Sequence, residues 1–195
     1  PLVGGNGDGK RGMQMVTVYV GIGSNLGDRV GNCLEGAAAM GRLPQTRLLA
    51  VSPLYETEPE EGAGPQWFVN AVAALETDLA PETLLAALQR LEALAGRRVE
   101  RARGKNRTLD LDLLLYGDLV RETPPPALPH PRMHRRRFVL EPICAVAPDA
   151  LHPRLGRPVR ELLAALAPGP AVRPLEAQGS SWGSAAGAVG AARPA

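Results

Sequence analysis

The sequence predicts a single α+β domain in which helices pack on an antiparallel sheet. Short apolar segments alternate with segments of helical period in the order β-α-β-β-α-β. The 195 residues are 45% hydrophobic and 22% charged, which suits one buried core in a globular protein. With strands and helices of these lengths, the element order is that of the ferredoxin-like fold.

The first half of the domain is predicted to hold one helix and three strands. Residues 16–22 (VTVYVGI) are apolar and rich in valine, as in a buried strand. Turn-forming residues follow, and Asp28 is well placed to cap a helix that runs to about Met40. Residues 47–55 and 67–76 are the next two strands. The segment between them is rich in proline, glycine and acid, which is typical of a loop.

The second half is predicted to add a long helix, two strands and two shorter helices. Pro81 opens the long helix where proline is tolerated, and leucines at helical spacing continue it to Gly96. The remaining predicted elements are an arginine-rich loop at 97–106, a strand at 107–116, a short return strand at 119–121, a proline-rich stretch at 124–131, and helices at about 139–146 and 158–166.

The two ends of the chain differ in composition from the part between them. Residues 1–15 are polar and rich in glycine, and we expect a flexible leader there with no signal-peptide core. The domain itself is expected at 16–168. Residues 169–195 are mainly Gly, Ala, Ser and Pro with little to bury, which predicts a disordered tail.

Charge and cysteine content exclude several classes of protein. The formal net charge is only +2, so no strong field draws the chain to nucleic acid or to a membrane. Two cysteines cannot form a disulfide framework, and no apolar run reaches the roughly 20 residues of a membrane span. We therefore expect a cytoplasmic protein with no nucleic-acid or membrane partner. Separately, we expect a monomer.

The most informative segment is Arg-Thr-Leu-Asp-Leu-Asp-Leu at 107–113. Residues two apart on a strand share a face, so Asp110 and Asp112 are expected to point the same way while Leu109, Leu111 and Leu113 enter the core. Mg²⁺ is held by one or two carboxylates together with substrate phosphates, which predicts a magnesium–nucleotide site. The simpler interpretation is an amphipathic edge strand with solvated acids.

Basic residues lie on both sides of this acidic pair in the sequence. Arginine forms planar, bidentate contacts with phosphate and can stabilise the charge of a transferring phosphoryl group. A solubilising loop is the alternative, and genome composition is the simpler reason for the high arginine count. The two groups are Arg97, Arg98, Arg101, Arg103, Lys105 and Arg107 before the pair, and Arg132, Arg135, Arg136 and Arg137 after it.

Three further features are weaker indicators of a site. The glycine-rich turn at 21–27 lacks the spacing of a dinucleotide or P-loop motif and is more simply a structural turn. His130 and His134 have the spacing of zinc ligands but no cysteine pair or acidic third ligand lies close in the sequence. Cys144 sits among apolar residues, which indicates a core position.

Taken together, the motifs resemble those of the 6-hydroxymethyl-7,8-dihydropterin pyrophosphokinase family. The resemblance covers residues 17–166, and the run Arg-Thr-Leu-Asp-Leu-Asp followed by Pro-His and Arg-x-Phe is highly specific. The shared motifs are GSNLGD at 23–28, NA at 70–71, QRLE at 89–92, RTLDLDL at 107–113, PHPR at 129–132 and FVLEP at 138–142.

This resemblance implies transfer of pyrophosphate from ATP to the pterin alcohol in folate synthesis, with release of AMP and two Mg²⁺ ions on Asp110 and Asp112. Phe68 and Phe138 would stack on the pterin, Asn70 would bind its edge, and Thr57 would offer backbone groups. The nucleotide and its phosphates would contact Leu85, Gln89, Glu92, Arg97, Arg107, Leu113, His130 and Arg136. Arg97, Arg107, Asp110 and Asp112 would be the catalytic residues.

The chain departs from the family pattern in two loops. Some members have Arg-Trp-Gly-Pro-Arg-Thr where this chain has RGKNRT at 103–108, so no tryptophan can seal the loop that is expected to close over ATP. Glu58 replaces a proline expected after Thr57. No side chain stands out as a general base.

Two other functions are compatible with the predicted fold. An RNA-recognition module has the same element order but needs exposed aromatic residues on its central strands, where this chain has Val, Ala and Leu. A non-catalytic interaction domain would bind neither magnesium nor nucleotide.

Overall fold

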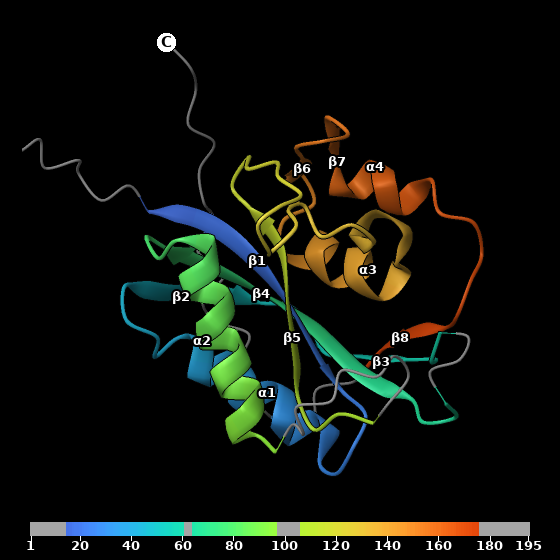
Figure 1. Ribbon diagram of the computed structural model, residues 1–195. Coiled ribbons are helices and arrows are strands. Elements are labelled where there is room, and N and C mark those ends of the chain that lie inside the picture. Colours follow the sequence, from blue (N-terminus) through green and yellow to red (C-terminus); the bar gives the residue numbers. More distant parts are fainter. Residues whose placement is uncertain (1–14, 61–63, 97–105, 176–195) are drawn as a thin grey trace, which may run out of the picture.

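The computed structural model describes residues 15–60, 64–96 and 106–175 (Figure 1). Its centre is a six-stranded antiparallel sheet in the order β5-β1-β4-β3-β8, with β2 also paired to β4. This order confirms the predicted α+β, ferredoxin-like arrangement. The strands of the sheet are β1 (Val16–Ser24), β2 (Thr46–Val51), β3 (Tyr55–Thr57), β4 (Phe68–Thr77), β5 (Asp110–Tyr116) and β8 (Val172–Pro174).

Helices cover both faces of the sheet (Figure 1). On one face lie α1 (Arg29–Met40) and α2 (Pro81–Leu94). The Asp28 carboxylate caps α1 by accepting from the Gly31 N–H at 2.9 Å, as predicted, and Pro81 is the first residue of α2. The other face carries the 3₁₀ turn η1 (Met133–Arg135), α3 (Arg137–Val146), the small hairpin of β6 (Leu151–His152) and β7 (Arg157–Pro158), and α4 (Val159–Ala164).

Each face of the sheet has its own hydrophobic core. Val20, Leu75 and Leu113 pack with α1 and α2 on one side. Leu114 and Leu140 belong to the cluster that α3 and α4 form on the other side. The sheet is therefore buried on both faces, and a polar group on it needs a partner or a ligand.

Two predicted strands have different bounds in the structure. The expected strand at 47–55 is two strands, β2 and β3, because the chain between them leaves the ladder: Pro53 has no N–H to donate, and the Ser52 hydroxyl accepts from the Val72 N–H at 2.9 Å. The expected strand at 107–116 begins only at Asp110.

Two other predictions, one for residues 119–121 and one for the C-terminal segment, are wrong. The return strand at 119–121 is a single bridge between Arg121 and Leu128, since the proline-rich stretch beside it cannot supply a ladder of donors. The expected tail contains the strand β8 at 172–174, so the ordered part continues past residue 168 to at least Leu175. The rest of the tail and residues 1–14 lie outside the described residues.

Candidate active site

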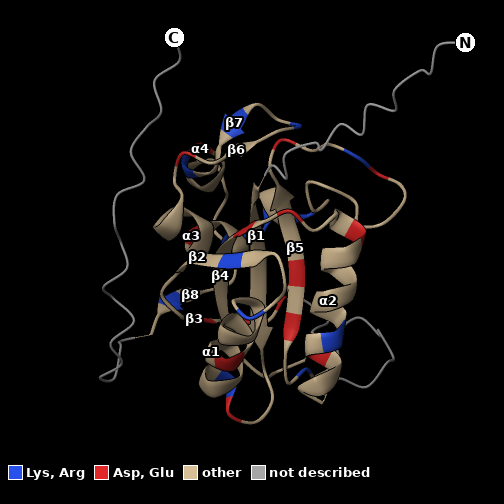
Figure 2. Cartoon of the chain, turned by 90° about the vertical axis from the view of Figure 1, so that its left-hand side faces the viewer, with Lys and Arg blue, Asp and Glu red and all other residues tan. Residues whose placement is uncertain are grey.

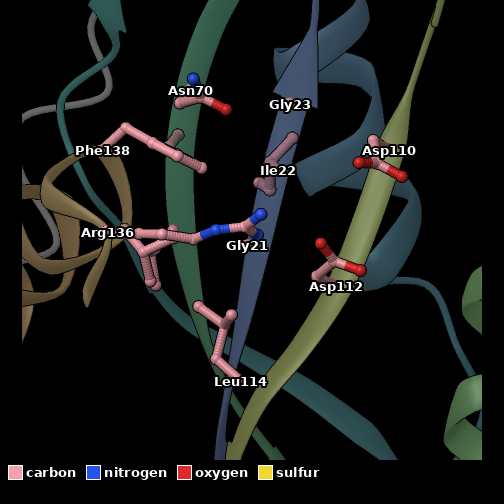
Figure 3. Close-up of a pocket in the computed structure, with 12 residues that line it drawn as sticks. Gly21, Ile22, Gly23, Asn70, Asp110, Asp112, Leu114, Arg136 and Phe138 are labelled. Carbon is pink, nitrogen blue, oxygen red and sulfur yellow. The ribbon is translucent and has the colours of Figure 1, made fainter. Parts of the chain in front are cut away.

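A pocket lies on the α3 side of the sheet, where β1, β4 and β5 run side by side (Figure 3). Its floor is backbone, because Gly21 and Gly23 of β1 have no side chains to fill it. The polar and aromatic side chains around it are Asn70 from β4, Asp110 and Asp112 from β5, and Arg136 and Phe138 from the start of α3. Five residues expected at a site from the sequence are thus brought together here.

Asp110 and Asp112 project from the same face of β5, as predicted (Figure 3). Figure 2 shows the acidic positions along this strand. The leucines between and beside them are 3–4% exposed and belong to the core on the opposite face. In the sheet, Asp110 is the partner of Gly23 and Asp112 the partner of Gly21. Both carboxylates therefore border the part of the pocket that has a glycine floor.

The carboxylate of Asp112 is costly to ionise in this pocket. Burial raises the pKa of Asp112, and the nearby Asp110 raises it further, while His130, Arg136 and Arg107 oppose the shift. Arg107 forms an ion pair with Asp110 through Nη1 and Oδ2. Within the described ranges no group of three or more His, Cys, Asp or Glu residues is placed to hold a metal ion, so the two carboxylates do not form a closed protein cage. This donor set fits Mg²⁺, which keeps water and phosphate oxygens as its other ligands.

Arg136 and His130 supply positive and proton-donating groups beside the carboxylates. The Arg136 side chain reaches across Gly21 toward β5 (Figure 3), lies 5.3 Å from the Phe138 ring centre, and donates to Glu60 Oε2 at 2.9 Å. His130 Nδ1 accepts from the Arg132 N–H at 3.2 Å, which assigns the ring proton to Nε2. Burial lowers the pKa of His130 despite the attraction of Asp112, which favours a neutral ring.

At the opposite end of the pocket, the Asn70 amide can form hydrogen bonds with the edge of a flat ring. Asn70 is 8% exposed, and its Nδ2 donates to Thr57 Oγ1 at 2.6 Å, so its amide is held at a fixed angle. Thr57 is the sheet partner of Phe68. Phe68 and Asn70 are two residues apart on β4, so their side chains lie on the same face of the strand. Phe138 lines the pocket, whereas Phe68 does not line it directly.

Asn25 fixes the residues that precede β5, a role that could not be predicted from the sequence. It is 4% exposed; its side-chain oxygen accepts from the Arg107 N–H at 2.6 Å and its Nδ2 donates to Asn106 at 3.3 Å. The Asn25 N–H also donates to the Arg107 carbonyl at 3.1 Å. The glycine-rich turn after β1 thus fixes the residues that precede β5. The turn was visible in the sequence, but its partner 82 residues away was not.

The residues expected at the nucleotide lie on α2 and on the α2 side of β5. Leu113 is buried in the core, Leu85 is half-buried and Gln89 is exposed. The Glu92 carboxylate is 2% exposed and accepts from the N–H of Leu111, between the two aspartates, at 2.9 Å. None of these four lines the pocket. Arg97, Arg98, Arg101, Arg103 and Lys105 lie outside the described residues.

Comparison with known proteins decides between the functions that this geometry allows. The model of one family, 7,8-dihydro-6-hydroxymethylpterin-pyrophosphokinase, matches residues 19–148. The chain belongs to this family. Among named relatives, the 2-amino-4-hydroxy-6-hydroxymethyldihydropteridine pyrophosphokinase of Pseudomonas aeruginosa is 49% identical over 76% of this chain and 90% of its own length. The enzyme of the same name from Haemophilus influenzae is 41% identical over 71% and 86%.

Solved structures support the fold of the pyrophosphokinase domain. The Plasmodium falciparum HPPK-DHPS structure with pteroate superposes with a TM-score of 0.62 over 77% of this chain and 44% of that one, at 13% identity. An HPPK-DHPS structure described as in complex with substrates gives the same TM-score at 12% identity, over 78% and 43%. The chain thus spans less than half the length of these solved chains, and the likeness concerns the fold alone.

Family membership gives the reaction. The chain is an ATP-dependent diphosphokinase of folate biosynthesis that transfers pyrophosphate to hydroxymethyldihydropterin, with ATP as co-substrate. The RNA-recognition and non-catalytic alternatives are therefore dropped. No helix within the described ranges has the length and apolar character needed to cross a membrane.

Proposed function

We propose that the pocket divides the reaction between two ends, with magnesium and the ATP phosphates at Asp110 and Asp112 and the pterin at Asn70 and Phe138. The single observation that supports this division is the pairing of Gly23 with Asp110 on one side and with Asn70 on the other. Gly23, which has no side chain, then lies between the two ends of the pocket.

At the pterin end, four residues bind and orient the ring. Asn70 forms hydrogen bonds with the heterocycle edge, with its angle fixed by the Thr57 hydroxyl. Phe138 stacks on one face of the ring, and Phe68 covers the other face. Backbone groups near Thr57 complete the contacts. The pterin hydroxymethyl group then points toward β5.

At the phosphate end, Asp110 and Asp112 would hold two Mg²⁺ ions, which would supply neutralisation of the phosphate charge. The hydroxymethyl oxygen attacks the β-phosphorus in line, the bond to the α-phosphate oxygen breaks, and AMP leaves. Arg107, Arg136 and the Nε2–H of His130 stabilise the charge that develops. We assign no side chain as general base.

The adenosine is proposed to lie at the outer edge of β5, next to α2. Among the described strands, β5 is an edge strand of the sheet. Leu85, Gln89, Glu92 and Leu113 would contact the nucleotide there, with Arg97 on its phosphates. Glu92 has a second role in this arrangement, because its bond to the Leu111 N–H fixes the strand that carries both aspartates.

Product analysis tests the proposal. Protein, ATP, Mg²⁺ and hydroxymethyldihydropterin are mixed, and the products are separated by mass spectrometry. A pterin heavier by one pyrophosphate, with AMP beside it and dependence on Mg²⁺, is the expected result. ADP in place of AMP, or full turnover in excess chelator, would overturn it. A cytoplasmic location and a monomeric state remain parts of the proposal.

A further inference from the structure

The strand β8 lies beyond the family-matched residues and pairs with β3, next to the proposed pterin site (Figure 1). Arg173 is the sheet partner of Glu56, and Val172 the partner of Thr57. The ladder is extended at both ends, because the Glu58 N–H donates to Ala171 O at 2.9 Å and the Leu175 N–H donates to Leu54 O at 2.8 Å. The short strand β3 is therefore held on both edges, by β4 and by β8.

A side-chain contact joins this C-terminal strand to the start of β4. The Arg173 guanidinium lies 5.1 Å from the centre of the Trp67 ring. The carbonyl of Trp67 accepts from Arg29 Nη1 at 2.8 Å, and Arg29 Nη2 pairs with Glu56 at 3.0 Å. Trp67 is thus held by its ring and by its backbone, immediately before Phe68, the first residue of β4.

We propose that Arg173 is a positioning residue for the pterin, acting through Trp67 on Phe68. Phe68 is the first residue of β4, so the ladder fixes the chain after it but not the chain before it. Unless the backbone before Phe68 is also fixed, its ring is free to take several orientations. A ring that is ordered before the ligand arrives does not have to be ordered on binding, which favours affinity. This inference rests on the proposed pterin site.

The position of Arg173 limits which kinetic constant it affects. β4 and β5 lie on opposite sides of β1, so Trp67 is separated from Asp110 and Asp112 by a whole strand. Arg173 therefore acts on pterin binding, and the phosphate chemistry and the ATP site are left as they are.

Steady-state kinetics of the full-length chain test the inference. Arg173→Ala is expected to raise KM for hydroxymethyldihydropterin about two- to five-fold, the size of one exposed cation–π contact, with kcat and KM for ATP unchanged. Arg173→Lys keeps a cation over the ring and restores most of the affinity. In a Trp67→Ala background, Arg173→Ala has no further effect, because the contact is already lost.

Two controls make the outcomes decisive. Arg154→Ala removes an exposed arginine of the β6–β7 hairpin, away from β3 and β8, that is ion-paired with Glu122, and leaves all constants unchanged (Figure 1). Phe68→Ala tests the pterin site itself: if its pterin KM is normal, the proposed site fails and the role of Arg173 falls with it. A raised KM for Phe68→Ala beside a normal KM for Arg173→Ala, or equal rises for pterin and ATP in Arg173→Ala, overturns the positioning role alone.

Discussion

Gly23 of β1 and Asn70 of β4 are paired so closely that a Cβ on Gly23 would lie 2.9 Å from the Asn70 side-chain oxygen. Contacts this short are essentially absent between real Cβ atoms and their neighbours, so one of the two groups would have to move. Asp110 is the partner of the same glycine on its other side. The absence of a side chain at residue 23 therefore leaves space between the Asn70 amide and the Asp110 carboxylate.

Gly23→Ala should weaken pterin binding. The new methyl group displaces the Asn70 amide from its bond with Thr57, and a lost buried hydrogen bond of this kind corresponds to a rise of about five- to one-hundred-fold in KM for the pterin. Gly21→Ala is the matched control, since its Cβ would meet a movable leucine side-chain atom at 3.4 Å. Equal pterin KM values for the two variants would contradict this explanation.

Asp110→Asn and Asp112→Asn should each lower kcat by roughly 10²- to 10³-fold, the effect of removing one group that stabilises charge in a transition state. Each change keeps the side-chain volume, so the circular dichroism spectrum should stay that of the parent. AMP release as a function of Mg²⁺ concentration is the measurement. Asp118→Asn, on the exposed turn after β5, serves as the control with parent-like turnover. Magnesium-dependent AMP release at the parent rate in Asp110→Asn would exclude this carboxylate as a ligand.

Thr57→Val should raise the pterin KM about tenfold, because it removes the acceptor at 2.6 Å that orients the Asn70 amide and replaces it with a methyl group of similar size. Thr57→Ser keeps the hydroxyl and should stay within about twofold of the parent. Binding of the pterin can be followed by titration calorimetry. The hypothesis fails if the valine and serine variants bind with the same affinity.

Local patterns were sufficient to predict most of the fold. Asp28 and Pro81 mark the starts of α1 and α2, and the alternation around Asp110 and Asp112 predicts which side chains face the pocket. These features depend on residues within one turn or one strand of each other. The strand β8 was missed because a three-residue edge strand with a proline has no periodicity of its own and is stabilised only by its partner β3.

The site was predictable to the extent that its residues belong to distinctive motifs. The acidic pair and Arg136 are such residues. The roles of Asn25 and Glu92 were not predictable in this way, because each depends on a hydrogen bond to the backbone of β5 or of the residues before it. A buried asparagine or glutamate has no sequence signature that names its partner. The Arg173–Trp67 contact likewise joins residues more than a hundred positions apart.

The contact between the half-buried His134 and the buried His152 gives a prediction for stability as a function of pH. Their rings meet edge to face with centres 5.6 Å apart, and His152 is 2% exposed with neither ring nitrogen bonded to a described protein atom. Burial lowers the pKa of both histidines below the ordinary value near 6.5, and nearby charge lowers it further, from Arg135 at His134 and from His134 itself at His152. Both rings are therefore neutral in the folded protein at neutral pH.

The sign of the effect follows from proton binding in the two states. Between the unfolded pKa and the lowered folded pKa, the unfolded chain binds more protons, so the free energy of unfolding falls as pH drops through this interval. Urea unfolding from about pH 7.5 to about pH 5 should show this decline, and His152→Phe should reduce its slope, because one of the histidines with a lowered pKa is gone. Because phenylalanine also places an apolar ring in a site that offers no hydrogen bonds, the variant should gain stability relative to the parent at the acid end. An unchanged slope in His152→Phe would mean that other groups cause the acid sensitivity.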